Sequence, residues 1–300
     1  MTSRIGDLAQ HRLMSTLMLG TQARMRETQA QLGSGKRADR FRDIAAEADR
    51  LLSAKDVLRR NERYVHNNNI VDARLEVMED ATSSLIGIGD RLRTLLIQRL
   101  NSASAVPGTL AVEAEQLLEE AVNRLNTSFA GRHLFAGSRT DAAPVALDPA
   151  FADFGQPDDT YYRGDEVVLS VRADDDVEIG YGVTADAQGF RQLIGALRGA
   201  IEADRSLDDG LLEESLGLVN RALGDIEDRR SEIGARRGML ERANTAHEDA
   251  RLLLQSVVGG VEDVDLAEAV TRLAQHQVAL QAAMMTLSRL QDLSLANYLR

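Results

Sequence analysis

The fold is decided by the stretch LAEAVTRLAQHQVALQAAMMTL, which occupies residues 266–287. Seven of its positions recur at alternating steps of four and three residues. The seven are Leu266, Val270, Leu273, Gln277, Leu280, Met284 and Leu287, and all of them except Gln277 are apolar. This spacing is the heptad seam of a helix that packs lengthwise against another helix. The stretch therefore predicts a long α-helix near the C-terminus that has a helical partner.

The same region carries very little charge. From residue 273 to residue 300 the only charged side chains are Arg289, Asp292 and Arg300. The outer face of a surface helix normally carries charges, whereas this one offers alanine, glutamine and serine. That composition favours a helix surrounded by other helices. An apolar stripe is more often the core of an ordinary soluble bundle, so both interpretations stay open here.

The N-terminal region has the same character. Residues 13–23 contain no charge, and Met18, Met25 and Leu32 recur every seven residues. We expect the two weakly charged ends to pair as helices, each about 40–60 Å long at 1.5 Å per residue. Further subunits would cover their outer faces. The residues predicted to pack between subunits are Leu8, Leu13, Leu17, Leu266, Val270, Leu273, Leu280, Met284 and Leu287.

The middle of the chain differs in composition from both ends. Three of the four prolines lie within residues 144–157, and eight of the eleven aromatic residues lie within 129–190. Two runs alternate at period two, which predicts a β-hairpin connected by residues 172–176, with Gly164 and Gly189 as flanking turn residues. The runs are Val167, Leu169 and Val171, followed by Val177, Ile179, Tyr181 and Val183.

Apolar residues at helical spacing return on both sides of this insert, in 70–100 and 211–240. Gly33-Ser34-Gly35 and Gly259-Gly260 are expected to break the arms. The sequence thus predicts a mainly α fold, with long antiparallel coiled-coil or helical-bundle arms formed by both termini and a small β-rich insert. The predicted parts are a terminal coiled-coil layer (1–40 and 260–300), a helical rod layer (41–135 and 205–259) and the insert (136–204).

Composition excludes several classes of function. Forty-seven acidic residues against 35 basic ones give a net charge of −12, which argues against nucleic-acid binding. The absence of cysteine excludes disulfides and thiol chemistry. The longest uncharged stretch, 273–288, is shorter than the roughly 20 residues of a membrane-spanning helix, so no membrane insertion is expected. Nearly all basic residues are arginine, and lysine occurs only at Lys36 and Lys55.

No catalytic, metal-binding or cofactor-binding pattern is present. The five histidines show no metal-ligand spacing, and there is no P-loop or nucleophile elbow. His247 and His276 are predicted to lie on polar helix faces. The triplet Asn67-Asn68-Asn69 is unusual in a helical region and could cap or break a helix. We therefore expect neither an enzyme nor a cofactor.

Six segments together resemble the flagellin superfamily, and most of all its hook–filament junction proteins, also called third hook-associated proteins. They occur in the family's order along both arms and at the edges of the insert. They are Leu32-Gly33-Ser34-Gly35-Lys36-Arg37, Gly131-Arg132-His133-Leu134-Phe135-Ala136-Gly137, Tyr162-Arg163-Gly164-Asp165, Arg230-Ser231-Glu232-Ile233-Gly234-Ala235-Arg236, Val261-Glu262-Asp263-Val264-Asp265-Leu266-Ala267-Glu268 and Ser294-Leu295-Ala296-Asn297-Tyr298-Leu299.

The resemblance implies an extracellular structural subunit of the bacterial flagellum, exported unfolded through the flagellar secretion channel. It implies self-assembly, with a neighbouring hook-associated protein, flagellin, an export chaperone and the secretion apparatus as partners. It also implies an inner layer made of the paired termini and an insert that faces outward. The insert region between Asp141 and Glu214 holds eighteen acidic residues against five arginines, which fits a solvated surface.

Two alternatives remain at this stage. One is a filament subunit of the same superfamily, because the chain keeps a terminal Arg300 as true flagellins often do. The other is a soluble cytoplasmic coiled-coil scaffold, against which the nearly uncharged surface of residues 273–300 argues.

Overall fold

The computed structural model describes residues 2–37, 45–101 and 108–298, and side chains within 12–37, 47–101 and 108–289. The chain divides into two compact units. The terminal unit consists of Met1–Arg59 and Ala250–Arg300, and the central unit consists of Arg60–Asp249. Two long helices, α2 (Ala45–Asn101) and α5 (Asp209–Glu262), contribute residues to both units.

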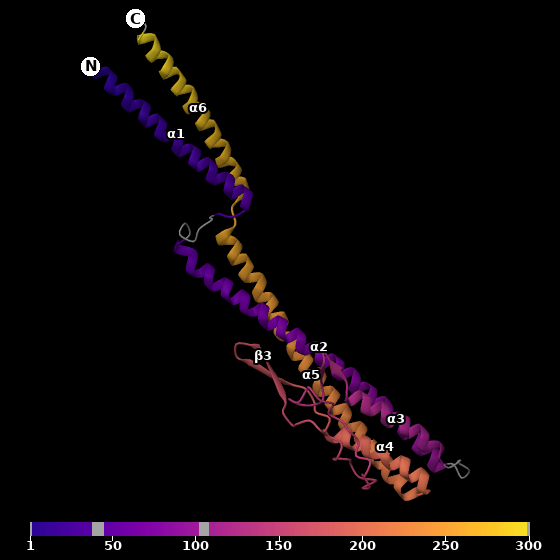
Figure 1. Cartoon of the computed structure of the whole chain (residues 1–300). Helices are drawn as coiled ribbons and strands as arrows, with labels where there is room; N and C mark the ends of the chain where they lie inside the picture. Colours follow the sequence, from indigo (N-terminus) through magenta and orange to yellow (C-terminus); the bar gives the residue numbers. More distant parts are fainter. Residues whose placement is uncertain (1, 38–44, 102–107, 299–300) are drawn as a thin grey trace. The chain divides into compact units, whose positions relative to one another are not determined.

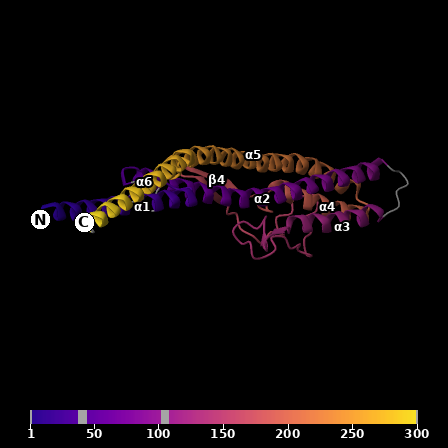
Figure 2. The same cartoon turned by 90° about the horizontal axis from the view of Figure 1, so that it is seen from above.

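The terminal unit is built around α1 (Thr2–Ser34) and α6 (Leu266–Tyr298). The two helices lie side by side and run antiparallel, so that both chain ends are at the same end of the pair (Figure 1, Figure 2). The start of α2 and the end of α5 complete this unit. The predicted pairing of the two chain ends is therefore present within one subunit.

The central unit is a packed bundle. Within it, α2 and α5 pack together with α3 (Thr109–Leu125) and α4 (Gln188–Ser206) around one apolar core. Fully buried side chains come from all four helices, including Leu85, Leu125, Leu193 and Ile226. Gly189 begins α4 close to α5, where an added Cβ would lie 2.8 Å from Ile226 Cγ1. Gly189 is thus a helix-packing residue, and its predicted role as a turn residue is wrong.

A buried carboxylate joins three helices of this bundle. Asp204 of α4 accepts hydrogen bonds from the backbone amides of Gly108 and Ala111, at 2.9 and 3.0 Å, where α3 begins. Its other oxygen receives Arg99 Nε at 2.9 Å from the end of α2. Gly108 has no side chain with which to cap α3, so Asp204 supplies that cap from another helix.

The insert between α3 and α4 contains two short two-stranded antiparallel sheets. One pairs β1 (Ser128–Phe129) with β2 (Arg132–His133), and the other pairs β3 (Leu169–Asp174) with β4 (Val177–Tyr181). The predicted hairpin is confirmed, with a tighter turn at residues 175–176 and an irregularity between Arg172 and Asp174. The other described residues of the insert are mostly loops and turns.

Polar anchors hold these loops in place. Buried Asp158 pairs with Arg198 of α4 at 2.6 Å, and the Arg198 guanidinium lies 4.4 Å from the centre of the Phe151 ring. The Tyr161 hydroxyl donates to the Ala185 carbonyl at 2.6 Å. Burial raises the pKa of Tyr161 well above its ordinary value, so this hydroxyl keeps its proton. The predicted fold class is confirmed, since long helices pack against each other and a small sheet region lies between α3 and α4 in the chain.

One predicted helix break is correct and the other is displaced. Helix α1 ends at Ser34, and Gly35 follows with a φ of 71°, a left-handed conformation that favours glycine. In the second arm, α5 continues through Gly259 and Gly260 and ends at Glu262. Gly259 and Gly260 are tolerated within the helix because a single glycine costs only about 1 kcal/mol relative to alanine.

Candidate assembly interface

Helix α6 carries two separate rows of residues, one covered and one exposed. The row that faces α1 is buried or half-buried, and it consists of Ala269, Leu273, His276, Leu280, Ala283 and Leu287. A second row is exposed, formed by Leu266, Val270, Val278, Met284 and Met285. Of these, Val278 has 65% of its surface exposed and Met285 has 59%. One side of α6 is thus covered by α1, and another side is left exposed by the described residues of the subunit.

Helix α1 repeats this arrangement with fewer residues. Met18, Met25 and Leu32 are half-buried, and Thr28 is buried. Leu13, Leu17 and Leu19 are more than half exposed. Exposed apolar side chains gathered on one helix pair are typical of an interaction surface. We call the exposed apolar residues of α1 and α6 the terminal apolar face.

The structure divides the nine predicted packing residues. Leu273, Leu280 and Leu287 are half-buried within the subunit, whereas Leu13, Leu17, Leu266, Val270 and Met284 lie on the terminal apolar face. The side chain of Leu8 lies outside the described residues. Their role between subunits stays a prediction.

The predicted packing residues did not include Leu19, Val278 or Met285. Val278 and Met285 are seven residues apart, which is itself a heptad signal. Neither residue belongs to the heptad seam predicted within residues 266–287. The segment of α5 that belongs to the terminal unit also exposes two leucines, Leu252 and Leu253. Both were missed.

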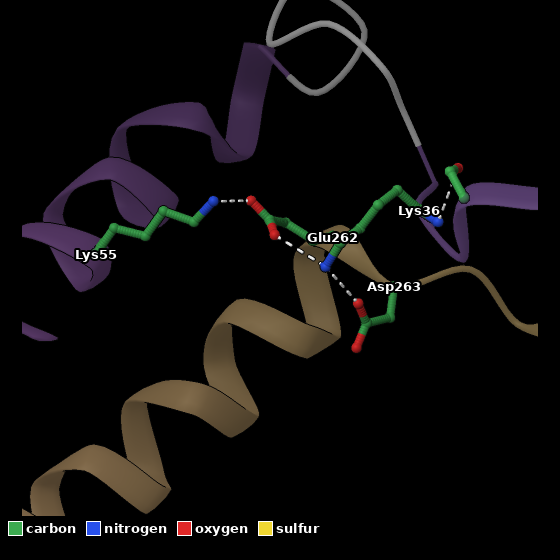
Figure 3. A network of polar contacts seen from close by, with 5 residues as sticks. Lys36, Lys55, Glu262 and Asp263 are labelled. Atoms are coloured by element: carbon green, nitrogen blue, oxygen red, sulfur yellow. Dashed lines mark hydrogen bonds and ion pairs between the residues drawn. The ribbon is translucent and has the colours of Figure 1, made fainter.

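A polar joint lies at the base of the α1–α6 pair, within the terminal unit. Figure 3 shows Lys36 and Lys55 converging on the carboxylate of Glu262, with Asp263 beside it. Lys36 Nζ lies 3.1 Å from Glu262 Oε2 and 2.9 Å from Asp263 Oδ1, and Lys55 Nζ pairs with Glu262 Oε1. The only two lysines of the chain therefore meet at one carboxylate.

The backbone reinforces this joint. The Arg37 amide donates to the Glu262 carbonyl at 2.6 Å, and the Val264 amide donates to the Gly35 carbonyl at 3.0 Å. These bonds form an isolated antiparallel bridge between Lys36, shortly after α1, and Asp263, in the segment between α5 and α6. The chain segments that follow α1 and precede α6 are thus fastened to each other.

Charge pairing sets the protonation of the joint. Hydrogen bonding to Lys55, and then to Lys36, lowers the pKa of Glu262 below its ordinary value of 4.5. Hydrogen bonding to Asp263, and then to Glu262, raises the pKa of Lys36 above its ordinary value of 10.5. Both groups are therefore charged at neutral pH, as these ion pairs require.

The surface of the central unit is hollowed beside the insert, with about 400 Å³ of space next to Gly189 and Arg236 and about 710 Å³ next to Phe154 and Arg191. The apolar cavity beneath the hairpin, beside Met78 and Tyr181, holds about 30 Å³, which is about the volume of one water molecule. Within 2–37, 45–101 and 108–298, no group of three or more histidines and carboxylates is placed to hold a metal ion. No helix in that part of the chain is long and apolar enough to cross a membrane.

Comparisons with known proteins identify the class to which this architecture belongs. Residues 7–140 match the bacterial flagellin N-terminal helical region, and residues 216–299 match the bacterial flagellin C-terminal helical region. The chain belongs to the bacterial flagellin family, a family of structural flagellar proteins.

Individual relatives narrow the comparison. The Escherichia coli K12 flagellar hook-associated protein 3 is 21% identical over 285 residues, which cover 88% of this chain and 90% of the relative. Among solved structures, Bacillus cereus FlgL has a TM-score of 0.57 at 20% identity and covers 70% of this chain and 99% of its own. The flagellar junction protein FlgL from Legionella pneumophila has a TM-score of 0.54 at 15% identity, covering 69% and 99% respectively.

Proposed function

We propose that this chain is the structural subunit that joins the flagellar hook to the filament. The observation that carries the proposal is the terminal apolar face, which no described segment of the subunit covers. A subunit of a helical assembly needs such faces, and its neighbours cover them. Support for the junction role comes from the names of the relatives, one a hook-associated protein 3 and another a flagellar junction protein.

In this proposal the work of the protein is mechanical. The nine predicted residues, together with Leu19, Val278 and Met285, pack between subunits in an inner layer made of the paired termini. The helices of the central unit form a second layer, and the acidic insert faces outward. The subunit contacts a neighbouring hook-associated protein on one side and flagellin on the other. It performs no enzymatic reaction and binds no cofactor.

Delivery is part of the same proposal. The chain would leave the cell through the flagellar export channel, escorted before export by a chaperone. A chain without cysteine suits that route, because it cannot form disulfides that would hinder unfolding or refolding.

The test is immunogold electron microscopy of intact flagella, with an antibody against residues 141–200 and a deletion strain beside it. The proposal predicts label in a narrow band at the hook tip, with filament subunits lost to the medium in the deletion strain. Label along the whole filament would make the chain a filament subunit, which is the alternative within the family. Protein found only in the cytoplasm would contradict both assignments.

A further inference from the structure

The helices α2 and α5 meet in one defined register within the central unit. Asn68 hydrogen-bonds to Asn244, Arg237 pairs with Asp72 and Glu79, and Gly89 packs against Leu223. The partner's number on α5 falls as the number on α2 rises, so the helices run antiparallel. Long helices that pair through repeated apolar positions can slip by a heptad, because the same kinds of side chain then meet again.

The seam changes character at one end. Through most of its length it is apolar, with Leu75, Leu85 and Leu92 on α2 and Ile226, Ile233 and Leu240 on α5, all fully or almost fully buried. Toward the start of α2 and the end of α5 the inward positions become Asn68, Asn244 and His247. Asn68 and His247 are buried, at 0% and 5% exposure. The prediction that His247 lies on a polar helix face is therefore wrong, and Asn68 neither caps nor breaks α2.

Asn68 and Asn244 bond to each other, and Asn68 and His247 both bond to the tip of the β3–β4 hairpin. Asn68 Nδ2 donates to Asn244 Oδ1 at 2.9 Å and to the Ala173 carbonyl at 3.3 Å. His247 Nε2 donates to the same carbonyl at 2.8 Å, which requires a proton on Nε2. Further along the hairpin, Asp175 receives the Tyr64 hydroxyl at 2.8 Å, and the Tyr64 ring stacks on His247.

One carbonyl thus receives donors from two helices. Asn68 comes from α2 and His247 comes from α5, and both reach Ala173 only while the helices keep their present register. A slip of one heptad would move one donor about 10 Å along the helix axis, at 1.5 Å per residue. It would also separate buried Asn68 from half-buried Asn244 and leave the Asn68 amide without this partner, which is costly.

We propose that Asn68, Asn244 and His247 form a register lock for α2 and α5, and that the hairpin tip docks through Ala173 only when the lock is closed. A buried asparagine pair lowers stability relative to leucine but excludes other pairings. Asn68 shows that cost here, because its Oδ1 is buried without a hydrogen-bond partner among the described residues. The lock therefore serves alignment rather than stability.

The direct test replaces the pair with leucine, Asn68→Leu together with Asn244→Leu, in the full chain. Spin labels at Ser83→Cys and Ser231→Cys report the register, since both serines are exposed and the chain has no other cysteine. The parent should give one narrow interspin distance. The double-leucine variant should keep its helix content but show an additional population, displaced by about 10 Å along the axis.

A second variant keeps the proposal testable if the first does not fold. His247→Phe keeps a ring that can stack on Tyr64 but removes the donor to Ala173. Hydrogen exchange in residues 167–181 should become about fivefold to tenfold faster, with the interspin distance unchanged. Thr82→Val is the matched control, because buried Thr82 bonds only to the Met78 carbonyl of its own helix, at 2.7 Å. It should change neither readout.

Two results would overturn the proposal. One is a single unchanged distance in the double-leucine variant together with full protection of the hairpin. The other is unchanged hairpin exchange in His247→Phe.

Discussion

The central unit and the terminal unit are built from the same kind of long helix, yet they bury apolar side chains to very different extents. Of the 44 buried apolar residues among the described side chains, 39 belong to the central unit. Of the 19 large apolar residues that are exposed, 11 belong to the smaller terminal unit. The central unit therefore buries most of its apolar side chains by itself, whereas the terminal unit leaves many of its large apolar side chains exposed.

The difference shows where each unit finds its stability. Four helices enclose the core of the central unit on all sides, as a soluble domain requires. The α1–α6 pair gives each helix a single neighbour along most of its length, and each helix covers only one side of the other. The central unit is stabilised by its own apolar core. The terminal unit would be stabilised by contacts with neighbouring subunits.

The largest expected effect lies in the central unit, at Asp204. Replacing it by alanine removes the cap of α3 and leaves the partly buried Arg99 without its carboxylate. Breaking a buried pair from one side typically costs about 3–5 kcal/mol. Urea unfolding of Asp204→Ala should show that loss. The same change at exposed Asp153 is the control, and an equally small effect at both positions would contradict the account.

Matched truncations compare the two units directly. Leu92→Ala removes a fully buried side chain, which should lower the free energy of unfolding by about 2–5 kcal/mol. Val278→Ala, on the terminal apolar face, should change the stability of the free subunit by less than about 0.5 kcal/mol. In the assembled flagellum we expect the opposite order of effects. There Val278→Ala should weaken the hook–filament connection more than Leu92→Ala does. Equal losses in the free subunit would show that Val278 is already covered there.

The smallest expected effect concerns the polar joint of the terminal unit. Glu262→Gln removes the carboxylate shared by Lys36 and Lys55, and partly exposed ion pairs are worth at most about 1 kcal/mol. Because these are the only side-chain amines, an amine-reactive reagent reports the joint directly. Both lysines should be modified several-fold faster in Glu262→Gln and unchanged in the control Glu268→Gln. Identical rates in all three proteins would show that the joint is open in solution.

The pH dependence of the joint follows from the lowered pKa of Glu262. A carboxyl whose pKa is lower in the folded state contributes stability above its unfolded pKa and loses it as pH falls through the folded value. The difference between the parent and Glu262→Gln should therefore be constant near neutrality and shrink as the pH falls below the ordinary pKa of a glutamate. Labelling is slow in acid, so proteolysis at the joint with an acid-active protease is the suitable measurement. A difference that does not shrink at all in acid would contradict this assignment.

Much of the fold could be predicted from periodicity. The heptads of residues 266–287 and the alternation in 167–183 were sufficient to predict the α6 helix and the β3–β4 hairpin, because these patterns express local geometry. The rows of α6 that face α1 could not be predicted, since Leu273 and Val270 are equally apolar and only the partner helix decides between them. His247, Asn68 and Asp204 were missed for a related reason: polar residues are normally exposed, and their buried partners are distant in sequence.

The most direct test of the central claim uses the absence of cysteine. A single Val278→Cys, with 65% of the parent side chain exposed, can be probed with a maleimide in the free subunit and in intact flagella. Asp159→Cys, exposed on the insert, is the control for access to assembled subunits. The account predicts that both cysteines react in the free subunit and that only Asp159→Cys reacts in flagella. Equal reactivity of Val278→Cys in the two states would show that no neighbouring subunit covers the terminal apolar face.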